Sequence, residues 1–141
     1  MRFAIVVSRF NSEVTGGLLG GAKAYLASEK IEVRSEDVFE APGAFEIPLI
    51  AQKLVRTGKY QGVICLGCVI KGDTAHFEFI SLGATVGIMQ ATLATETPIT
   101  FGILTTYTDE QAIIRSRDNP ENKGKEAAAA CLESARILAR I

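Results

Sequence analysis

The sequence lacks both a block of basic residues and a long uninterrupted apolar run. Its 141 residues include 15 Lys and Arg against 16 Asp and Glu, which gives a formal net charge of −1. Without a basic block, we expect neither nucleic acid nor an anionic membrane as a partner. The apolar runs are shorter than a bilayer span, so we expect no transmembrane helix. Residues 1–7 lack the apolar length of a signal peptide, and we therefore expect a cytoplasmic protein.

Cysteine and histidine are also scarce. The chain has three cysteines, Cys65, Cys68 and Cys131, and a single histidine, His76. An odd number of cysteines without a signal peptide indicates reduced thiols. Cys65 and Cys68 form a CxxC pattern, but residues three apart on a strand face opposite sides, and a zinc site would lack ligands. We interpret both as buried apolar residues rather than as a redox or metal site.

The residues that are present predict one α/β domain over residues 1–141. Apolar residues make up 48% of the chain, an ordinary globular value, and strand-like runs alternate with segments of helical period. The expected strands are 3–7, 37–40, 62–70 and 99–105. The expected helices are 14–26, 45–57, 76–95, 109–115 and 120–141, the last capped by Asn119. This alternation predicts a four-stranded parallel sheet in a doubly wound, flavodoxin-like three-layer sandwich.

Ligands of such sheets bind beyond the carboxyl ends of the strands. After the third expected strand, Gly72 lets a ligand approach the backbone, and the helix that follows offers free N–H groups to an anion such as phosphate. The alternative is an ordinary turn in which Asp73 or Thr74 caps the helix. His76 lies in the first helical turn, where the helix dipole favours a neutral ring that can exchange protons. A surface or capping role is the alternative for His76.

The segments after the first two strands carry aromatic and acidic side chains. Phe10 follows the first strand and is placed either to stack on a flat heterocycle or to pack against the next helix as a hydrophobic staple. Residues 41–46 form a rigid turn that presents Phe45 and the Glu46 carboxylate to a polyol. The alternative is a plain helix start with an acidic first turn.

Basic residues gather before the last expected helix, at Arg115, Arg117 and Lys123. An arginine such as Arg115 can hold a phosphate through two parallel hydrogen bonds. The alternative is a solvated surface, where most Lys and Arg side chains lie.

Six of these segments, taken in order, resemble the signature blocks of the lumazine synthases. They are Ser-Arg-Phe-Asn at 8–11, Pro-Gly-Ala-Phe-Glu-Ile-Pro at 42–48, Gly-Cys-Val-Ile-Lys-Gly at 67–72, His-Phe-Glu-Phe at 76–79, Phe-Gly-Ile-Leu-Thr-Thr at 101–106 and Asn-Lys-Gly at 122–124. The resemblance covers essentially the whole chain at the family's usual spacing.

The resemblance implies a site formed between the subunits of a cyclic pentamer. Phe10 would stack on the pyrimidine substrate, and His76 would move protons. The remaining implied contacts from the same subunit are Ala44, Phe45 and Glu46 to the ribityl chain, backbone groups of Cys68, Val69 and Ile70 to the pyrimidine, and Asp73 and Thr74 to the phosphate. The neighbouring subunit would supply Phe101, Arg115 and Lys123.

The implied reaction joins 5-amino-6-(D-ribitylamino)uracil to 3,4-dihydroxy-2-butanone 4-phosphate and needs no metal or redox cofactor. A dehydrogenase is disfavoured, because the glycine fingerprint after the first strand is absent. A carrier or shell protein that binds a flavin or lumazine without turnover stays open. The run Arg-Asp-Asn-Pro-Glu at 117–121 departs from the Gly-Thr-Lys-x-Gly run of members that form icosahedral shells, so further assembly of pentamers also stays open.

Four glycines, Gly16, Gly17, Gly20 and Gly21, fall inside the first expected helix. Each costs about 1 kcal/mol relative to alanine in a helix interior. Their spacing matches neither a dinucleotide fingerprint nor a P-loop. Gly17 and Gly20 stand where lumazine synthases usually have other residues, which puts the stability of this helix in question.

Overall fold

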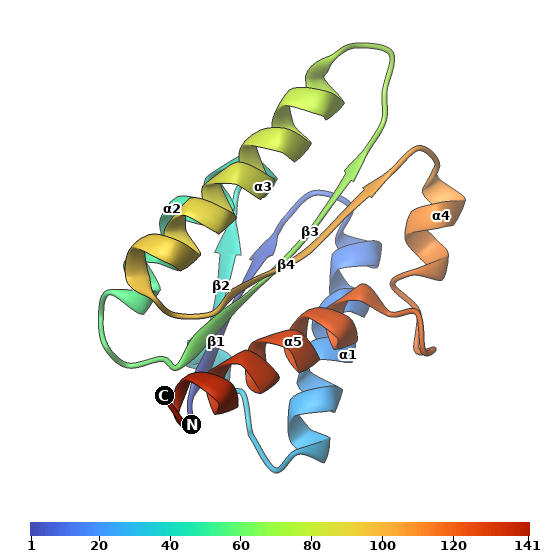
Figure 1. The fold of residues 1–141 in the computed structure, drawn as a ribbon. Helices are drawn as coiled ribbons and strands as arrows, with labels where there is room; N and C mark the ends of the chain where they lie inside the picture. The colour runs from blue at the N-terminus through green and yellow to red at the C-terminus, as the bar shows by residue number, and fades with distance from the viewer.

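Four parallel strands form the centre of the computed structural model, which describes residues 1–141. They are β1 (Phe3–Ser8), β2 (Val38–Ala41), β3 (Gly62–Ile70) and β4 (Ile99–Thr106), in the spatial order β2-β1-β3-β4 (Figure 1). All three neighbouring pairs are parallel. The continuous apolar runs in β1 and β3 form central strands because helices cover both faces of the sheet. The predicted four-stranded α/β fold is confirmed.

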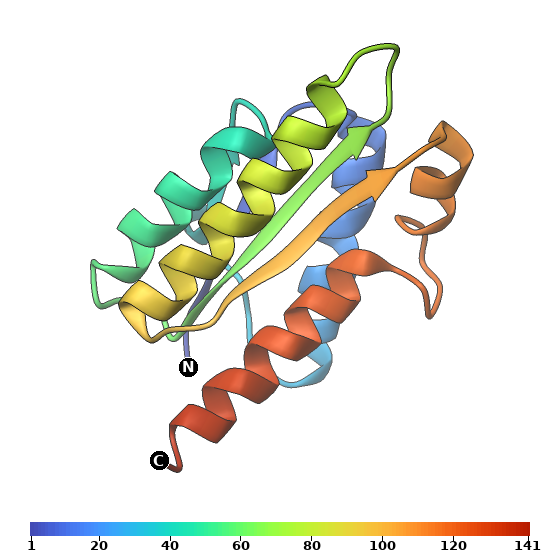
Figure 2. The ribbon, with the colours of Figure 1, turned by 45° about the horizontal axis from the view of Figure 1, so that its top comes forward.

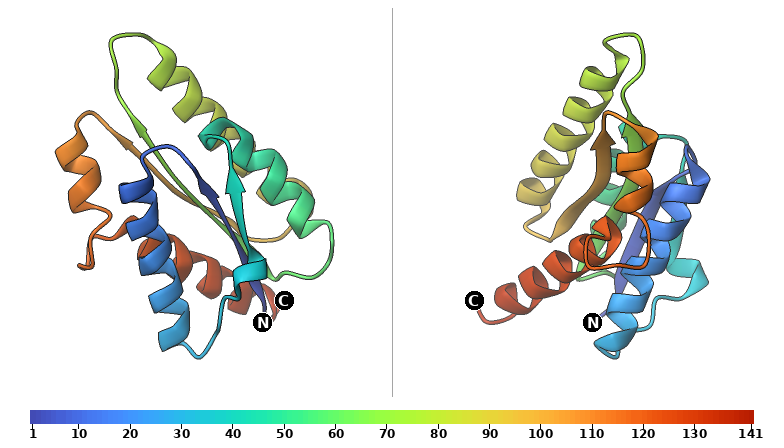
Figure 3. Two further views of the ribbon diagram at one scale, coloured as in Figure 1. Left: turned by 180° about the vertical axis from the view of Figure 1, so that it is seen from behind. Right: turned by 90° about the vertical axis from the view of Figure 1, so that its right-hand side faces the viewer.

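Helices form a layer on each face of this sheet (Figures 2 and 3). One layer holds α2 (Ile47–Val55) and α3 (His76–Thr95), and the other holds α1 (Ser12–Ser28), α4 (Asp109–Ile114) and α5 (Lys123–Leu138). Two short 3₁₀ turns, Ser35–Asp37 and Ala44–Glu46, flank β2. Side chains alternate along each strand, so β1 sends Ile5 into the core below α1 and α5, and Val6 into the core below α2 and α3.

The last helix starts later than the sequence predicts. α5 begins at Lys123, and its cap is Asn122, whose Oδ1 accepts a hydrogen bond from the Lys125 N–H at 3.0 Å. The prediction of Asn119 as the cap was wrong. The amide of Asn119 instead donates to the Ile114 carbonyl at 2.9 Å, which keeps residues 115–121 in a turn. The helix also ends at Leu138, short of the predicted Ile141.

Helix α3 corrects the expectation about membrane-spanning segments. Its 20 residues, His76–Thr95, reach a mean hydropathy of 1.3, which is long and apolar enough to cross a bilayer by length and composition alone. Helices of water-soluble proteins meet the same criterion, so this single case is weak support for a span. Ala84, Ile88 and Ala91 of α3 are buried against the sheet, and only 17% of the apolar window is buried within the chain.

Two of the four glycines in α1 allow the segment just before α5, from Ser116 to Asn122, to pack directly on the α1 backbone. A Cβ atom on Gly17 would collide with the carbonyl oxygen of Ser116, and one on Gly21 would collide with the amide of Asn122. The space is occupied by the buried Asn122 side chain, which donates to the carbonyls of Gly17 at 3.2 Å and Ser116 at 3.1 Å. Close packing of α1 and α5 therefore requires glycine at these two positions.

A buried carboxylate connects the amino ends of the strands. Asp37 is 1% exposed and accepts hydrogen bonds from the guanidinium of Arg2, the shortest at 2.7 Å, and from the Tyr60 hydroxyl at 2.8 Å. The hydrogen bonds from Arg2, and then the one from Tyr60, lower the pKa of Asp37 below its usual value near 3.8 although burial opposes them. The cluster ties the residue before β1 to the start of β2 and to the turn before β3.

Gly17→Ala and Gly16→Ala should change stability in opposite directions. A Cβ atom on Gly16 meets open space, so Gly16→Ala should stabilise the chain by about 1 kcal/mol through helix propensity. Gly17→Ala must displace the Ser116 backbone and should destabilise it by about 1–3 kcal/mol. Urea unfolding of both variants measures the difference. Equal effects at the two positions would contradict the proposed packing role of Gly17.

Asp37→Asn should destabilise the fold by about 1–3 kcal/mol near neutral pH, because a buried charge-assisted hydrogen bond is weakened. The folded pKa of Asp37 is lowered, so its contribution is present above the unfolded pKa and is lost as pH falls through the folded value. The difference between wild type and variant should therefore shrink below about pH 4. Thermal unfolding across pH measures this, with the exposed Glu32→Gln as the control, because Glu32 lies outside the cluster. A pH-independent difference would contradict it.

Candidate active site

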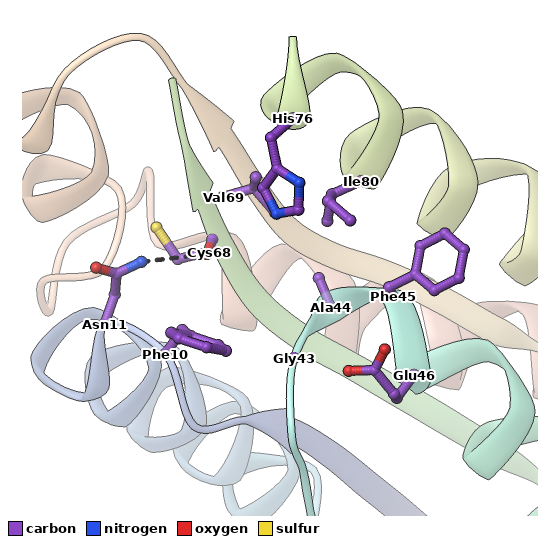
Figure 4. A pocket seen from close by; sticks show the side chains of 10 residues that line it. All are labelled: Phe10, Asn11, Gly43, Ala44, Phe45, Glu46, Cys68, Val69, His76 and Ile80. Atoms are coloured by element: carbon purple, nitrogen blue, oxygen red, sulfur yellow. Dashed lines mark hydrogen bonds between the residues drawn. The ribbon is translucent and has the colours of Figure 1, made fainter. Parts of the chain in front are cut away.

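A pocket of about 380 Å³ opens beyond the carboxyl ends of β1, β2 and β3 (Figure 4). Its lining residues are Phe10, Asn11, Gly43, Ala44, Phe45, Glu46, Cys68, Val69, His76 and Ile80. The strand order reverses between β1 and β3, since β2 lies on one side of β1 and β3 on the other. Such a reversal leaves a crevice between the loops that leave the two strands, and ligands of doubly wound sheets bind there.

Phe10 provides an exposed aromatic face in this pocket. Its side chain lies in the loop between β1 and α1 and is 67% exposed. The ring edge lies beside the turn after β2, where a Cβ atom on Gly43 would be in ordinary contact with it at 3.5 Å. Figure 4 shows the ring pointing toward the centre of the pocket. This placement favours stacking on a flat ligand over a hydrophobic staple against α1.

Polar groups stand around the aromatic ring. Glu46 lies at the end of the 3₁₀ turn before α2, and its carboxylate is at the opposite end of the pocket from Asn11 (Figure 4). His76 is the first residue of α3, and its imidazole points into the pocket. The backbone N–H of His76 donates weakly to the Thr74 hydroxyl at 3.4 Å, but the cap position of α3 is Ala75 and has no side-chain capping bond, so the alternative that Asp73 or Thr74 caps the helix was wrong.

A second group of predicted site residues lies elsewhere on the chain. Phe101, Arg115 and Lys123 line a separate pocket of about 280 Å³ beside the exposed edge of β4. The Lys123 backbone N–H donates to the Arg115 carbonyl at 2.9 Å, which holds the two basic residues together. The Arg115 guanidinium donates to the Gln111 carbonyl at 3.0 Å, and the Lys123 ammonium pairs with Glu126 at 3.0 Å. Both cations keep further donor capacity for an anion.

Three predicted site residues line neither pocket. Ile70 is the last residue of β3 and lines a different depression, and Asp73 and Thr74 are exposed in the loop before α3. Conversely, Asn11, Gly43 and Ile80 line the first pocket but were not predicted as site residues. Asn11 directly follows Phe10 at a strand end, and this position was the available signal. Ile80 follows His76 by one helical turn, which places both on one side of α3.

The CxxC cysteines are buried on opposite faces of the sheet, as predicted. Cys65 lies in the core below α2 and α3, and Cys68 lies in the core below α1 and α5. Burial raises the pKa of Cys68 to about 11 and that of Cys131 to about 12, and it also raises the pKa of Cys65. Thiols with raised pKa values are poor nucleophiles at neutral pH.

Comparison with known proteins connects this geometry to one enzyme family. The sequence profile described as 6,7-dimethyl-8-ribityllumazine synthase matches residues 1–139. The chain is 66% identical to 6,7-dimethyl-8-ribityllumazine synthase 1 of Caulobacter vibrioides over 140 residues, which cover 99% of this chain and 92% of that relative. It is 49% identical to the synthase of Salinibacter ruber, over 99% of this chain and 90% of that relative. The synthase of Nitratidesulfovibrio vulgaris strain DP4 is 46% identical over the whole chain and 90% of its own length.

The three thiols should resist modification in the folded protein. At about pH 8 the raised pKa values leave almost no thiolate, and burial blocks access, so a disulfide reagent should react with less than one thiol per chain in minutes. The same reagent should titrate all three thiols after unfolding in guanidinium chloride. Rapid stoichiometric reaction of native Cys68 would contradict its buried, raised-pKa state.

Proposed function

This chain belongs to the 6,7-dimethyl-8-ribityllumazine synthase family, and from this premise we propose how its two pockets carry out the family's reaction. The reaction condenses 5-amino-6-(D-ribitylamino)uracil with 3,4-dihydroxy-2-butanone 4-phosphate to give 6,7-dimethyl-8-ribityllumazine, the penultimate step of riboflavin biosynthesis. Both substrates are small molecules. The whole chain, residues 1–141, acts as one domain in this proposal, which the match over residues 1–139 supports.

The first pocket holds the pyrimidine substrate. Its ring stacks on Phe10, and backbone groups of Cys68, Val69 and Ile70 bind its polar edge. The ribityl chain extends past Ala44 and Phe45 toward the Glu46 carboxylate. The observation that carries this assignment is the convergence of an exposed aromatic ring, a carboxylate and the only histidine in one pocket of suitable size.

The phosphate substrate binds at the amino end of α3. Asp73 and Thr74 lie in the loop that precedes this helix, where free backbone N–H groups and the helix dipole favour an anion. Arg115 and Lys123 of the same chain line the other pocket, so in this proposal a neighbouring subunit brings its own copies, with its Phe101, to complete the site.

An apolar stripe on α3 supports association of the chain with copies of itself. Phe79, Leu82, Val86, Met89 and Leu93 are 44–70% exposed and recur at alternating spacings of three and four residues. This is the spacing at which helices pack along a shared seam. A homo-pentamer with such seams would cover the stripe and bring the two pockets of neighbouring subunits together.

The proposed chemistry uses only groups of this chain. The substrate amine attacks the ketone, and water leaves as the imine forms; phosphate is then eliminated. The enol left by this elimination becomes a ketone, and attack of the second amine on that ketone closes the ring with loss of a second water. His76 takes and returns protons in these steps, and much of the acceleration comes from holding two substrates in one place. The proposed reaction needs no metal or redox cofactor. We also propose a cytoplasmic location, which the three unpaired cysteines support.

A direct assay tests the proposed function. Both substrates are mixed with the purified protein in the presence of a chelator, and formation of the fluorescent product is followed. A heat-denatured sample gives the spontaneous rate. Product formation well above that rate supports the proposal. A native protein that binds the product but leaves the rate unchanged is a carrier, and activity that returns only with one added metal contradicts the cofactor-free mechanism.

His76→Ala should lower kcat while leaving the fold intact. General acid–base help contributes about 10²–10⁴-fold, and the spontaneous condensation sets a floor below which the measured loss cannot go. Steady-state kinetics and thermal unfolding separate the two effects. A kcat equal to that of the wild type would assign His76 a capping or surface role.

Phe10→Ala and Arg115→Ala should complement each other in mixed oligomers. Phe10→Ala should mainly raise KM for the pyrimidine by removing a stacking face, and Arg115→Ala should mainly raise KM for the phosphate substrate by removing a charge-assisted contact. If a site takes Phe10 from one chain and Arg115 from the next, some interfaces of a mixed oligomer keep both residues. Refolding the two variants together should therefore restore activity above that of either alone.

Native mass spectrometry provides the control for the complementation experiment, because it shows whether both chains occupy one oligomer. Separately refolded variants, mixed afterwards, provide a matched sample without shared interfaces. Mixed oligomers no more active than the better variant would place both residues in the site of a single chain.

A further inference from the structure

Asn11 occupies the cap position of α1 but does not cap the helix. Its backbone is left-handed, with φ 56° and ψ 54°, and its side chain makes no capping hydrogen bond. Asparagine is among the best capping residues, and capping needs an extended backbone at that position. Elsewhere in the same chain Thr108 and Asn122 cap α4 and α5 with side-chain hydrogen bonds. Asn11 therefore gives up a capping bond and adopts a less favourable backbone conformation.

The side chain of Asn11 binds the end of β3 instead. Its amide Nδ2 donates to the carbonyl oxygen of Cys68 at 3.2 Å (Figure 4). The backbone pairing of β1 with β3 ends earlier, at Val7 opposite Leu66. The Asn11 amide thus adds a connection between the two chain segments beyond the end of their ladder, at the mouth of the first pocket.

Two hydrogen bonds, made by the residues before and after Phe10, attach its loop to the neighbouring strands. On one side the Arg9 N–H donates to the Ala41 carbonyl at 3.0 Å, which ties the loop to β2. On the other side Asn11 ties the loop to β3. Phe10 lies between these attachments, and its ring, 67% exposed, has little packing of its own to hold it. The orientation of the ring relative to the Cys68–Val69 backbone therefore depends on the Asn11 bond.

We propose that Asn11 is a positioning residue for the heterocyclic substrate. Its bond to Cys68 holds the Phe10 ring and the carboxyl end of β3 at the separation that a flat ring requires. This inference rests on the proposed function and names the group that prepares the pyrimidine subsite before binding. Such preparation lowers the entropy lost on binding, so its removal weakens affinity for the pyrimidine without altering the chemical step.

Two substitutions separate this role from a structural one. Asn11→Gly keeps the left-handed backbone and removes the amide, and Asn11→Asp keeps the shape of the side chain but has no N–H to donate. Neither should destabilise the fold strongly, because glycine relieves the backbone and an acidic residue suits a helix amino end. Both should raise KM for the pyrimidine roughly tenfold, the equivalent of one lost hydrogen bond. The KM for the phosphate substrate and kcat at saturation should stay within about twofold.

Lys30→Gly is the matched control, because Lys30 also has a left-handed backbone, with φ 63°, beyond the other end of α1. This variant should leave both KM values unchanged. Titration with the product, 6,7-dimethyl-8-ribityllumazine, measures pyrimidine-site affinity without turnover, and thermal unfolding reports on the fold.

Three outcomes decide the inference. Weaker product binding by both Asn11 variants, with thermal stability near that of the wild type, supports it. Product affinity and pyrimidine KM within about twofold of the wild type overturn it, as does a parallel loss of kcat and of affinity for both substrates. A wild type that binds the product without catalysing its formation contradicts the proposed function, and the affinity comparison still decides the role of Asn11.

Discussion

The parallel pairing of β1 with β3 is the constraint on which the site depends. Because these two strands are buried on both faces, their register is fixed by apolar side chains that fill two cores at once. The strand order reverses at this pair, so the following loops diverge and leave room for a ligand. Phe10, Cys68 and His76 meet only because β1 and β3 end at the same edge of the sheet.

The two central strands could be predicted from the sequence, because a strand that is buried on both faces is a continuous apolar run. The runs that form β1 and β3 are continuous and apolar, and their bounds were predicted almost to the residue. The start of α5 was not predicted correctly. Asn119 and Asn122 are both suitable capping residues, and only tertiary contacts decide which of them caps the helix. Asn11 was not among the predicted site residues, because its role depends on a contact that sequence spacing does not show. An asparagine before a helix resembles a cap, and its bond to Cys68 joins residues 57 positions apart.

The isolated chain leaves several features unfavourable. The apolar stripe on α3 and the ring of Phe10 face solvent, and Asn11 has a left-handed backbone. The family resemblance implied a site shared between subunits, and a single chain places most of the predicted residues in two separate pockets. The exposed stripe and the separate pockets have one explanation in the proposed oligomer, where copies of the chain cover the stripe and complete each site. The left-handed backbone of Asn11 is instead offset within the chain by its bond to Cys68.

The close packing at Gly17 has a mechanical consequence. Asn122 anchors the segment that carries Arg115 and Lys123 to the carbonyl of Gly17, which lies about 9 Å along α1 from Asn11. The loop that carries Phe10 and the segment that carries Arg115 and Lys123 are thus both attached to the amino-terminal half of α1. In the proposed oligomer, each α1 helix would contribute to two neighbouring sites. A movement of α1 at one site would therefore also reach the next site around the oligomer.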